Sequence, residues 1–329
     1  MSILCSGSFV ADILVPDLPK IGPPGSLTYA PNGIHLSPGG HSSNVAIDLA
    51  QLGASDIYAV GSVGEDEIGE FLIRQLRNRG VTPLPEIQKN STTAKNVALL
   101  VRGEDRRYIA ELTANSLLSE EHLTDSINKI KPTLFHQGTL GGLPKIEKNL
   151  LQILEKTSEI GAFNFIDVIM PTNGWRYLDT AYPLIDILHA NQLEALNLTQ
   201  EKNPYKALSK LTQTGARLVI ITDAQNGVIA GTQKHLVTMP AFKIEQKDPT
   251  GAGDALSAGI LAYLWENKHQ VNHLSEPETI AALLLAGQAA GAACVTGIGA
   301  TTNVTMKKVK NILDQQIDQV KKHTRIETK

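Results

Sequence analysis

The sequence predicts an α/β fold of the doubly wound kind, with a mostly parallel sheet, helices on both faces and a small β-sheet lid. Three observations carry this prediction. Short apolar runs typical of buried strands alternate with longer helical segments along most of the chain. Residues 12–36 break that alternation because they are rich in Pro and Gly. Residues 93–112 break it again because polar and apolar side chains alternate there.

The main sheet is predicted from apolar, β-branched runs, taken in chain order as Ile3–Val10, Ile57–Val60, Thr133–His136, Phe163–Asp167, Ile185–Ala190 and Leu218–Thr222. The helices expected between and after them are Ser43–Leu52, Ile68–Arg79, Ile146–Ile160, Pro204–Thr214 and Gly253–Trp265. One further apolar segment, Ile280–Val295, is about one turn short of a bilayer span and contains Gln288. We interpret it as a buried core helix.

The two interrupting segments are expected to form the lid. Short extended pieces are predicted near Leu27–Ala30 and Ile34–Ser37, and a hairpin over 93–112 with its turn at Gly103–Asp105. Such a flap either covers a substrate site or is a surface hairpin without function, and the pattern alone leaves both open. The predicted division is an α/β nucleotide- and substrate-binding domain over residues 1–11, 37–92 and 113–329, with a β lid over 12–36 and 93–112.

Composition narrows the class of protein. With 329 residues, 42% of them hydrophobic and 19% charged, the chain is long and apolar enough for a large globular fold. A net charge of −3 gives no basic field for nucleic acid or an anionic membrane. Two cysteines, Cys5 and Cys294, make neither a disulfide framework nor a metal knuckle. We therefore expect a cytoplasmic protein whose N-terminus is a buried strand and not a signal peptide.

The most informative segment is DPTGAGDA (248–255), which leads into an apolar helix. Its glycines, Gly251 and Gly253, permit backbone turns that a side chain would forbid. The free N–H groups at the start of the helix then suit an anion such as a phosphoryl group in transfer. Asp254, in the first turn, can accept the proton of an attacking hydroxyl. The alternative is that Thr250 and Asp254 merely cap the helix.

Two common nucleotide-binding motifs do not fit this chain. No GxxxxGK[ST] loop occurs, and GAGDAL lacks the third glycine of a dinucleotide fingerprint. A second glycine-rich segment, PGGHSSNVA (38–46), also leads into a helix. Asn44 in this segment carries both donors and acceptors, so it can hydrogen-bond a polyol. The alternative is a helix start capped by Ser42 or Ser43.

The segments GGHSSNVAIDLAQLG (39–53) and DPTGAGDALSAG (248–259) resemble the two signature motifs of the ribokinase/PfkB carbohydrate kinase family, in order and in separation. The resemblance extends from the strand around Gly7–Asp12 to about Thr302. It implies a ribokinase-like fold and a kinase that uses ATP and Mg²⁺ to phosphorylate a hydroxyl of a small sugar or sugar-like substrate. It also implies a homodimer through the lid sheets, since exposed sheet edges invite pairing.

The resemblance assigns roles residue by residue. The catalytic set is Asp254 as base, with Gly251, Ala252 and Gly253 forming an anion hole. The substrate-binding set is Asp12, Gly40, Asn44 and Asp254, and His41 beside them is added as a candidate substrate contact that the family pattern does not itself assign. The set facing ATP is Asn191, Thr222, Gly227 and Gly253 for the phosphates and Gln288 for the adenine pocket. Glu194, in the motif NQLE (191–194), would organise Mg²⁺ through water, and Asp248 and Thr250 are candidate ligands for a monovalent cation such as K⁺.

The chain departs from the family pattern at two places. In the turn TDAQNG (222–227), Ala224 replaces the usual Gly and Asp223 adds negative charge where ATP phosphates are expected. Ala224 fits such a turn without strain if its φ is negative. His41 occupies a position that often holds a small residue or Lys, and it is either a substrate contact or a partly exposed surface histidine.

Two other functions stay open from the sequence. A nucleoside kinase of the same fold would need aromatic lid residues to sandwich a base, and the lid segments contain only Tyr29 and Tyr108. This scarcity favours a sugar over a nucleoside. A catalytically silent sugar- or nucleotide-binding regulator is the other alternative, and the intact Gly251–Asp254 segment argues against it.

Overall fold

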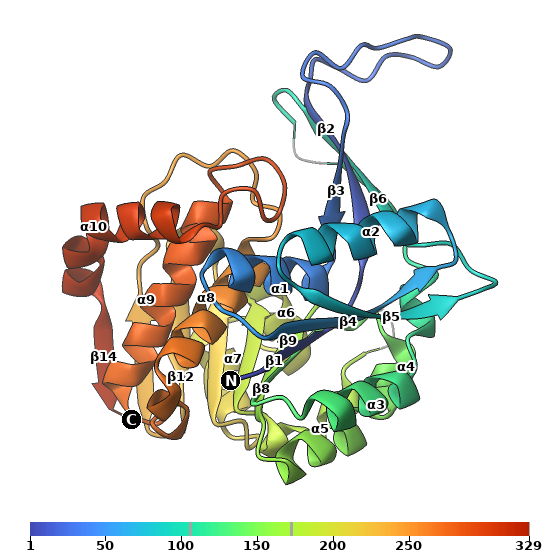
Figure 1. Cartoon of the computed structure of the whole chain (residues 1–329). Helices are drawn as coiled ribbons and strands as arrows, with labels where there is room; N and C mark the ends of the chain where they lie inside the picture. The colour runs from blue at the N-terminus through green and yellow to red at the C-terminus, as the bar shows by residue number, and fades with distance from the viewer. Residues whose placement is uncertain (105–106, 172–173, 329) are drawn as a thin grey trace.

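The computed structural model describes residues 1–104, 107–171 and 174–328 (Figure 1). Within them, the main sheet has the strand order β14-β13-β12-β11-β10-β9-β8-β1-β4-β5. The strands from β11 to β5 run parallel, and β12, β13 and β14 add an antiparallel edge. Their bounds are β1 Ile3–Ser6, β4 Ile57–Gly64, β5 Thr82–Gln88, β8 Leu134–Leu140, β9 Phe163–Val168, β10 Ile187–Asn191, β11 Leu218–Thr222, β12 Val228–Gly231, β13 His235–Met239 and β14 Arg325–Thr328.

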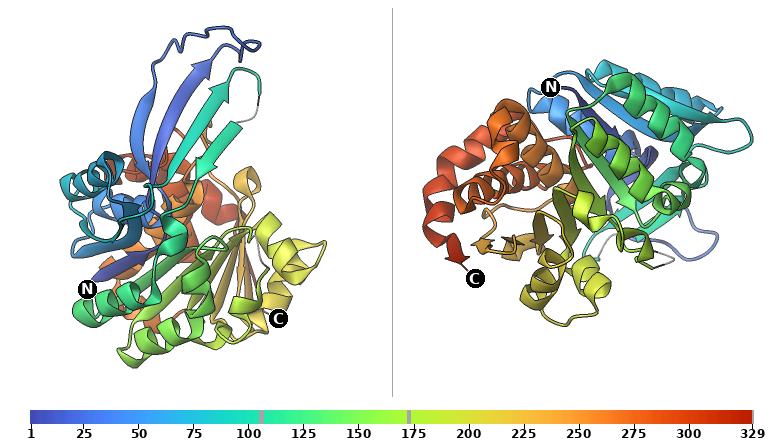
Figure 2. Two further views of the ribbon diagram at one scale, coloured as in Figure 1. Left: turned by 90° about the vertical axis from the view of Figure 1, so that its right-hand side faces the viewer. Right: turned by 90° about the horizontal axis from the view of Figure 1, so that it is seen from below.

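Helices cover both faces of this sheet (Figure 2). Side chains alternate along a strand, so Ile3 and Cys5 enter one buried cluster and Leu4 enters another. The first cluster takes apolar residues from α1 His41–Gln51, α2 Glu67–Asn78, α8 Ala252–Glu266, α9 Pro277–Cys294 and α10 Met306–His323. The second takes them from α3 Glu120–Ile130, α4 Pro144–Lys148, α5 Leu150–Glu159, α6 Gln192–Thr199 and α7 Pro204–Thr212. The predicted doubly wound architecture is confirmed.

The lid is a second, smaller sheet that projects from the main domain (Figure 2, left). Its strands are β2 Val10–Leu18, β3 His35–Gly39, β6 Lys95–Val101 and β7 Arg107–Glu111, in the order β3-β2-β6-β7. The predicted hairpin is β6 with β7, paired antiparallel, and Asp105 of its predicted turn lies outside the described residues. The piece predicted near Leu27–Ala30 belongs to no strand.

Two elements that were predicted to be continuous are each interrupted in the structure. The segment Ile3–Val10 is not one strand, because β1 ends at Ser6 and Val10 already begins β2 of the lid. Between them the backbone N–H of Ser8 donates to Thr139 Oγ1, so a side chain replaces a strand partner. The helix predicted over Ile146–Ile160 is interrupted at Asn149, whose φ of −114° and ψ of 14° are not helical.

Candidate active site

The first turn of α8 presents backbone N–H groups that no side chain caps. Gly251 is the N-cap residue, at a φ of 80°, and a Cβ there would lie 2.5 Å from that of Ala300. Only glycine fits this close approach. Among the described residues no side chain accepts a hydrogen bond from these N–H groups, and the hydroxyl of Thr250 donates to Asp248 Oδ1 at 2.6 Å. The alternative in which Thr250 and Asp254 cap α8 is therefore wrong, because Asp248 takes up the loop's polar groups instead.

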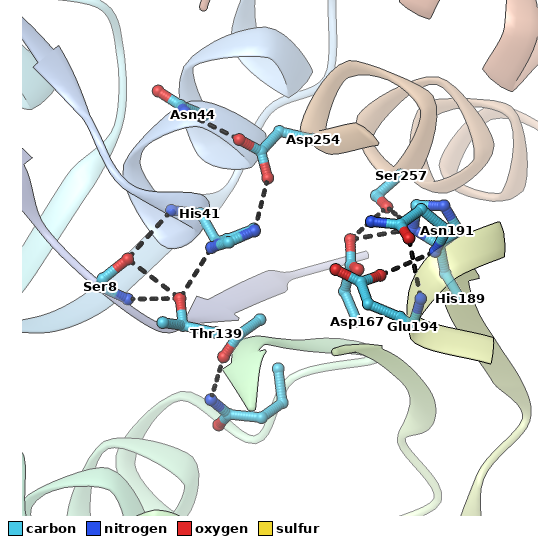
Figure 3. A network of polar contacts seen from close by, with 12 residues as sticks. Ser8, His41, Asn44, Thr139, Asp167, His189, Asn191, Glu194, Asp254 and Ser257 are labelled. Carbon is cyan, nitrogen blue, oxygen red and sulfur yellow. Dashed lines mark hydrogen bonds and ion pairs between the residues drawn. The ribbon is translucent and has the colours of Figure 1, made fainter. Parts of the chain in front are cut away.

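Asp254 lies in that uncapped first turn and is 7% exposed (Figure 3). Asn44 Nδ2, on α1, donates to Asp254 Oδ2 at 2.7 Å. The other oxygen, Oδ1, is buried without a hydrogen bond among the described residues, and His41 Nε2 lies 3.6 Å from it. Burial raises the pKa of Asp254, and the nearby His41 and Asn44 oppose that rise. One oxygen is thus fixed in place, while the other is buried with its hydrogen-bonding capacity unused among the described residues.

The start of α1 places His41 beside Asp254. Gly40 precedes it with a φ of 89°, and a Cβ on Gly40 would lie 2.4 Å from the carbonyl oxygen of Ser8. The imidazole Nδ1 lies 2.9 Å from Thr139 Oγ1, and the backbone N–H of His41 donates to Ser8 Oγ. These contacts fix the ring with Nε2 directed at Asp254 (Figure 3).

Neither serine at the start of α1 caps the helix, so that alternative is wrong. The Ser42 hydroxyl lies over the main sheet and donates to the carbonyls of Cys5 and Val60. The Ser43 hydroxyl is buried without a hydrogen-bond partner among the described residues. The start of α1 therefore depends on Gly40 and on the contacts of His41.

Asp12 enters the same site from the lid. It lies on β2, is 6% exposed, and accepts a hydrogen bond from Asn96 Nδ2 of β6 at 3.1 Å. Burial, with smaller contributions from the charges of Asp254 and Asp248, raises the pKa of Asp12 to about 6 against the opposing effect of the Asn96 hydrogen bond. The base of the lid and the start of α8 therefore share one electrostatic environment.

A second polar cluster lies beyond the start of α8, at the carboxyl ends of the central strands (Figure 3). His189 of β10 and Asp167 of β9 are register partners on neighbouring parallel strands, and Nδ1 lies 3.0 Å from Asp167 Oδ2. Ser257 Oγ of α8 donates to the same oxygen at 3.0 Å. His189 Nε2 lies 3.3 Å from Thr222 Oγ1 at the end of β11.

Asp167 and His189 shift each other's pKa. The positive charge of His189 lowers the pKa of Asp167 to about 2 against the opposing effect of burial. Burial lowers the pKa of His189, but Asp167, with smaller contributions from Glu194 and Asp254, raises it above its ordinary value overall.

Asn191 and Glu194 form a capping box at the start of α6. Asn191 Oδ1 accepts from the Glu194 N–H at 3.0 Å, and Glu194 Oε2 accepts from the Asn191 N–H at 2.7 Å. No hydrogen bond from the described part of the chain reaches the other oxygen, Oε1. A carboxylate oxygen with that freedom fits a hydrated Mg²⁺, because this ion keeps several of its waters when it binds.

The family follows from comparison with known proteins. A family model described as "pfkB family carbohydrate kinase" matches residues 2–307. The chain belongs to the pfkB family of carbohydrate kinases. It is accordingly a carbohydrate kinase, a phosphotransferase with an alcohol group as acceptor.

Individual relatives agree with this assignment. The chain is 28% identical to a probable fructokinase-6, chloroplastic, of Arabidopsis thaliana over 93% of this chain and 80% of that one. It is 26% identical to a ribokinase of Haemophilus influenzae over 92% and 94% of the two chains. A structure of fructokinase with bound ATP from Xylella fastidiosa superposes with a TM-score of 0.80 at 24% identity, covering 96% and 99%. That last likeness shows that the fold is shared.

The structure of this pfkB kinase brings the residues assigned to the sugar and to catalysis into one place. Asp254, Asn44 and His41 are in contact with or beside one another, and Asp12 lies within electrostatic reach of Asp254. The residues assigned to ATP extend from there across the strand ends. Gly227 packs against Met239 at the end of β13 and against Pro240, and Gln288 Nε2 donates to Pro240 O at 3.2 Å, so both contact the segment that follows β13.

Ala224 does not meet the condition under which it would fit the turn without strain. Its φ is +43°, so the negative φ that would have let Ala replace Gly without strain is absent. The residue is exposed, and Asp223 beside it accepts a hydrogen bond from Asn226 Nδ2 at 2.9 Å. The turn therefore keeps its shape at a local conformational cost.

Sequence reasoning missed several polar residues of the site, namely Ser8, Asn96, Thr139, Asp167, His189 and Ser257. Asp167 ends a predicted strand and His189 stands one residue before the end of another, and such positions face ligands in open α/β sheets. That signal could have found these two. Ser8, Asn96 and Thr139 carry no comparable pattern, because only the packing of the lid against β8 and α1 brings them to His41 and Asp12.

The described residues contain neither a cluster of metal-ligating side chains nor a membrane-spanning helix. In residues 1–104, 107–171 and 174–328, no group of three or more His, Cys, Asp or Glu side chains could hold a metal ion. No helix in those same ranges combines the length and the apolar character needed to cross a membrane.

Proposed function

We propose that this kinase transfers the γ-phosphoryl group of ATP to a hydroxyl of a small sugar, with Asp254 as general base. The observation that carries the proposal is the state of the Asp254 carboxylate. It is buried at an uncapped helix start, Asn44 fixes Oδ2, and Oδ1 has no hydrogen bond within the described chain. A base placed this way can take a proton at Oδ1 while the adjacent N–H groups face the phosphoryl group.

The chain's own residues divide the work of an in-line transfer. Asp12, Asn44 and the Gly40–His41 segment bind the sugar hydroxyls and orient one of them toward Asp254. Asp254 Oδ1 accepts the proton of that hydroxyl as its oxygen bonds to the γ-phosphorus and the bond from phosphorus to the ADP oxygen breaks. The N–H groups of residues 252–254, in the Gly251–Gly253 anion hole, stabilise the charge on the moving phosphoryl group.

The nucleotide is expected along the carboxyl ends of β10 and β11. Asn191, Thr222 and Gly227 would face its phosphates, and Gln288 would line the adenine pocket. Glu194 would hold Mg²⁺ through water, and the ion would supply charge compensation on the phosphates. The assignment of Asp248 and Thr250 to a monovalent cation such as K⁺ stays a prediction, and no step of the proposal uses it.

The test is the variant Asp254→Asn, which keeps the shape of the side chain and removes its basicity. We expect kcat to fall about 10²- to 10⁴-fold because a general base of this kind contributes that much. The assay couples ADP release to NADH oxidation with the preferred sugar. Asp314→Asn, the same change at an exposed position on α10, is the control and should leave kcat unchanged. Near-normal turnover of Asp254→Asn would remove Asp254 from the mechanism.

A nucleoside acceptor is the main alternative. The lid segments carry only Tyr29 and Tyr108 as aromatic residues, and both are exposed. A base sandwich needs apolar or aromatic walls, so this lid favours a sugar. The names of the relatives, fructokinase and ribokinase, favour the same class. A panel of fructose, ribose, other sugars and nucleosides, with ADP release as readout, decides between the two classes.

A silent regulator is the remaining alternative, and the uncapped start of α8 beside a buried carboxylate argues against it. Ligand-dependent stabilisation without phosphoryl transfer from any donor would favour the regulator.

The two cysteines are both buried and unpaired, which supports a reducing compartment such as the cytoplasm.

A further inference from the structure

The pair of Asp167 and His189 has no role in the transfer described so far, yet it occupies the floor of the phosphoryl site. His189 is 3% exposed and Asp167 is 4% exposed. The position that a Cβ would take on Gly253 lies 3.5 Å from His189 Cε1, so the imidazole packs directly beneath the anion hole. Buried ionic groups are costly and are kept only where their partners compensate for the lost hydration.

The two ring nitrogens are constrained differently. Asp167, with a pKa of about 2, is ionised and can only accept, so Nδ1 must carry a hydrogen. Nε2 faces Thr222 Oγ1, which can donate or accept. In a neutral imidazole, Nε2 would accept a hydrogen bond from the Thr222 hydroxyl, so the hydroxyl hydrogen would point toward His189 and away from the nucleotide side. In an imidazolium, Nε2–H donates to Thr222 Oγ1, and the hydroxyl hydrogen is released toward the nucleotide side.

The surrounding charges favour the imidazolium. The groups that face His189 are Asp167 on β9, Glu194 on α6, Asp254 and Ser257 on α8, Thr222 on β11 and His136 on β8. Three of these are carboxylates. Among the described residues, no Lys or Arg forms an ion pair with Asp167 or Asp254. A site this acidic must accept a polyanion, and His189 is the buried group whose charge offsets part of that repulsion.

We propose that His189 is a positioning residue for ATP: held by Asp167, its Nε2–H donates to Thr222 Oγ1 and so directs the Thr222 hydroxyl hydrogen to a phosphate oxygen of the nucleotide. The proposal rests on the proposed function, because it gives Thr222 its place at the phosphates. His189 and Thr222 therefore act together, since His189 orients the hydroxyl with which Thr222 binds the phosphate. No proton leaves His189 during transfer.

A double-mutant cycle tests whether the two residues act as a unit. MgATP affinity is measured by calorimetry without sugar for the wild type, His189→Gln, Thr222→Val and the double variant. Each single change should raise the Kd for MgATP about tenfold, which is the loss of one charge-assisted hydrogen bond. The double variant should be no weaker than Thr222→Val alone. His122→Gln, a half-buried histidine on α3 that contacts Leu84 O, is the matched control and should bind MgATP as the wild type does.

A direct measurement on the wild type needs no variant to fold. ¹⁵N NMR of the histidine rings at pH 7.5 should show both nitrogens of His189 protonated, and the His189→Gln spectrum identifies the resonance. A single protonated nitrogen would overturn the proposal, and so would multiplicative effects of His189→Gln and Thr222→Val on the Kd.

The MgATP readout also separates this inference from the proposed function. If no sugar or nucleoside is phosphorylated but the cycle shows coupling, the positioning role of His189 survives alone. If sugar phosphorylation holds and the two effects multiply, the positioning role fails alone.

Discussion

Asp12 is a buried carboxyl group whose ionisation should affect both the stability of the fold and its proposed role in sugar binding. Its pKa in the folded chain is about 6, against an ordinary value of 3.8, so the ionised form destabilises the fold. That cost is fully present above pH about 6, shrinks as the pH falls, and is absent below the ordinary value. Asp12→Asn should therefore raise the free energy of unfolding at pH 7.5 by about 1–3 kcal/mol. Urea denaturation at pH 7.5 measures the change.

The same substitution should weaken sugar binding, because an ionised carboxylate accepts a hydroxyl hydrogen more strongly than an amide does. We expect the KM for the sugar to rise about tenfold at pH 7.5, and the wild-type KM to rise as the pH falls below about 6. Asp17→Asn is the control on the same strand, and it should bring no gain in stability because Arg102 lowers the pKa of Asp17. A loss of stability in Asp12→Asn would contradict the account.

Ala224 carries a conformational cost that a single substitution can relieve. At a φ of +43° its Cβ costs about 1–2 kcal/mol, while glycine adds about 0.5–1 kcal/mol of unfolded-state entropy. Ala224→Gly should therefore stabilise the chain by about 0.5–1 kcal/mol in urea denaturation. Ala281→Gly, inside α9 at negative φ, should instead destabilise it by about 1 kcal/mol. If both variants changed the free energy of unfolding in the same direction, Ala224 would not be strained.

At the level of elements, the lid touches the loop that precedes α8. Tyr108 of β7 and Thr250 form a hydrogen bond of 3.1 Å between their hydroxyls. If this contact holds the lid over the sugar, Tyr108→Phe should raise the KM for the sugar by up to about tenfold with little change in kcat, the loss of one neutral hydrogen bond. Steady-state kinetics measure both constants.

Tyr29→Phe is the matched control for the lid contact. It removes the same hydroxyl from a lid residue that is 79% exposed, and we expect no effect on the KM. An unchanged KM in Tyr108→Phe, or an equal rise in Tyr29→Phe, would show that the hydroxyl pair does not hold the lid closed.

The elements differ in how far local sequence determines them. The run Ile185–Ala190 predicts β10 to within two residues, because most of the buried residues of this parallel strand are apolar. β14, Arg325–Thr328, is exposed and mostly polar, and it forms by pairing with β13. No local sequence pattern therefore predicts it. The break after Ser6 depends on Thr139, which is distant in sequence.

The residues of the candidate site also differ in how far local sequence predicts them. Motifs that are contiguous in sequence, such as Gly251–Asp254, could be predicted because glycine placement and helix start are local. The pair of Asp167 and His189 depends on the register of two strands. Asn96 meets Asp12 only because β6 pairs with β2. Contacts of this kind are properties of the tertiary fold, so sequence reasoning reaches the residue types but not their partners.

At the scale of the whole molecule, the site is assembled where two sheets meet. The main domain supplies Asn44, Asp254 and the strand ends, and the lid supplies Asp12. The lid projects away from the body (Figure 2, left). Large apolar side chains of the lid are exposed, namely Leu27, Tyr29, Ile34, Leu36 and Ile109. Within the described residues β3 and β7 are also free edges. Exposed apolar edges favour pairing with a second copy.

We therefore expect a homodimer formed through the lids. Sedimentation velocity should give twice the monomer mass at micromolar concentration. The double variant Ile34→Lys with Leu36→Lys should shift the mass to the monomer, because buried charges oppose the pairing of two such surfaces. Ile160→Lys, the same change at an exposed apolar residue at the end of α5, should leave the dimer intact. A monomeric wild type, or a dimer that survives both lid substitutions, would show that the copies pair elsewhere or not at all.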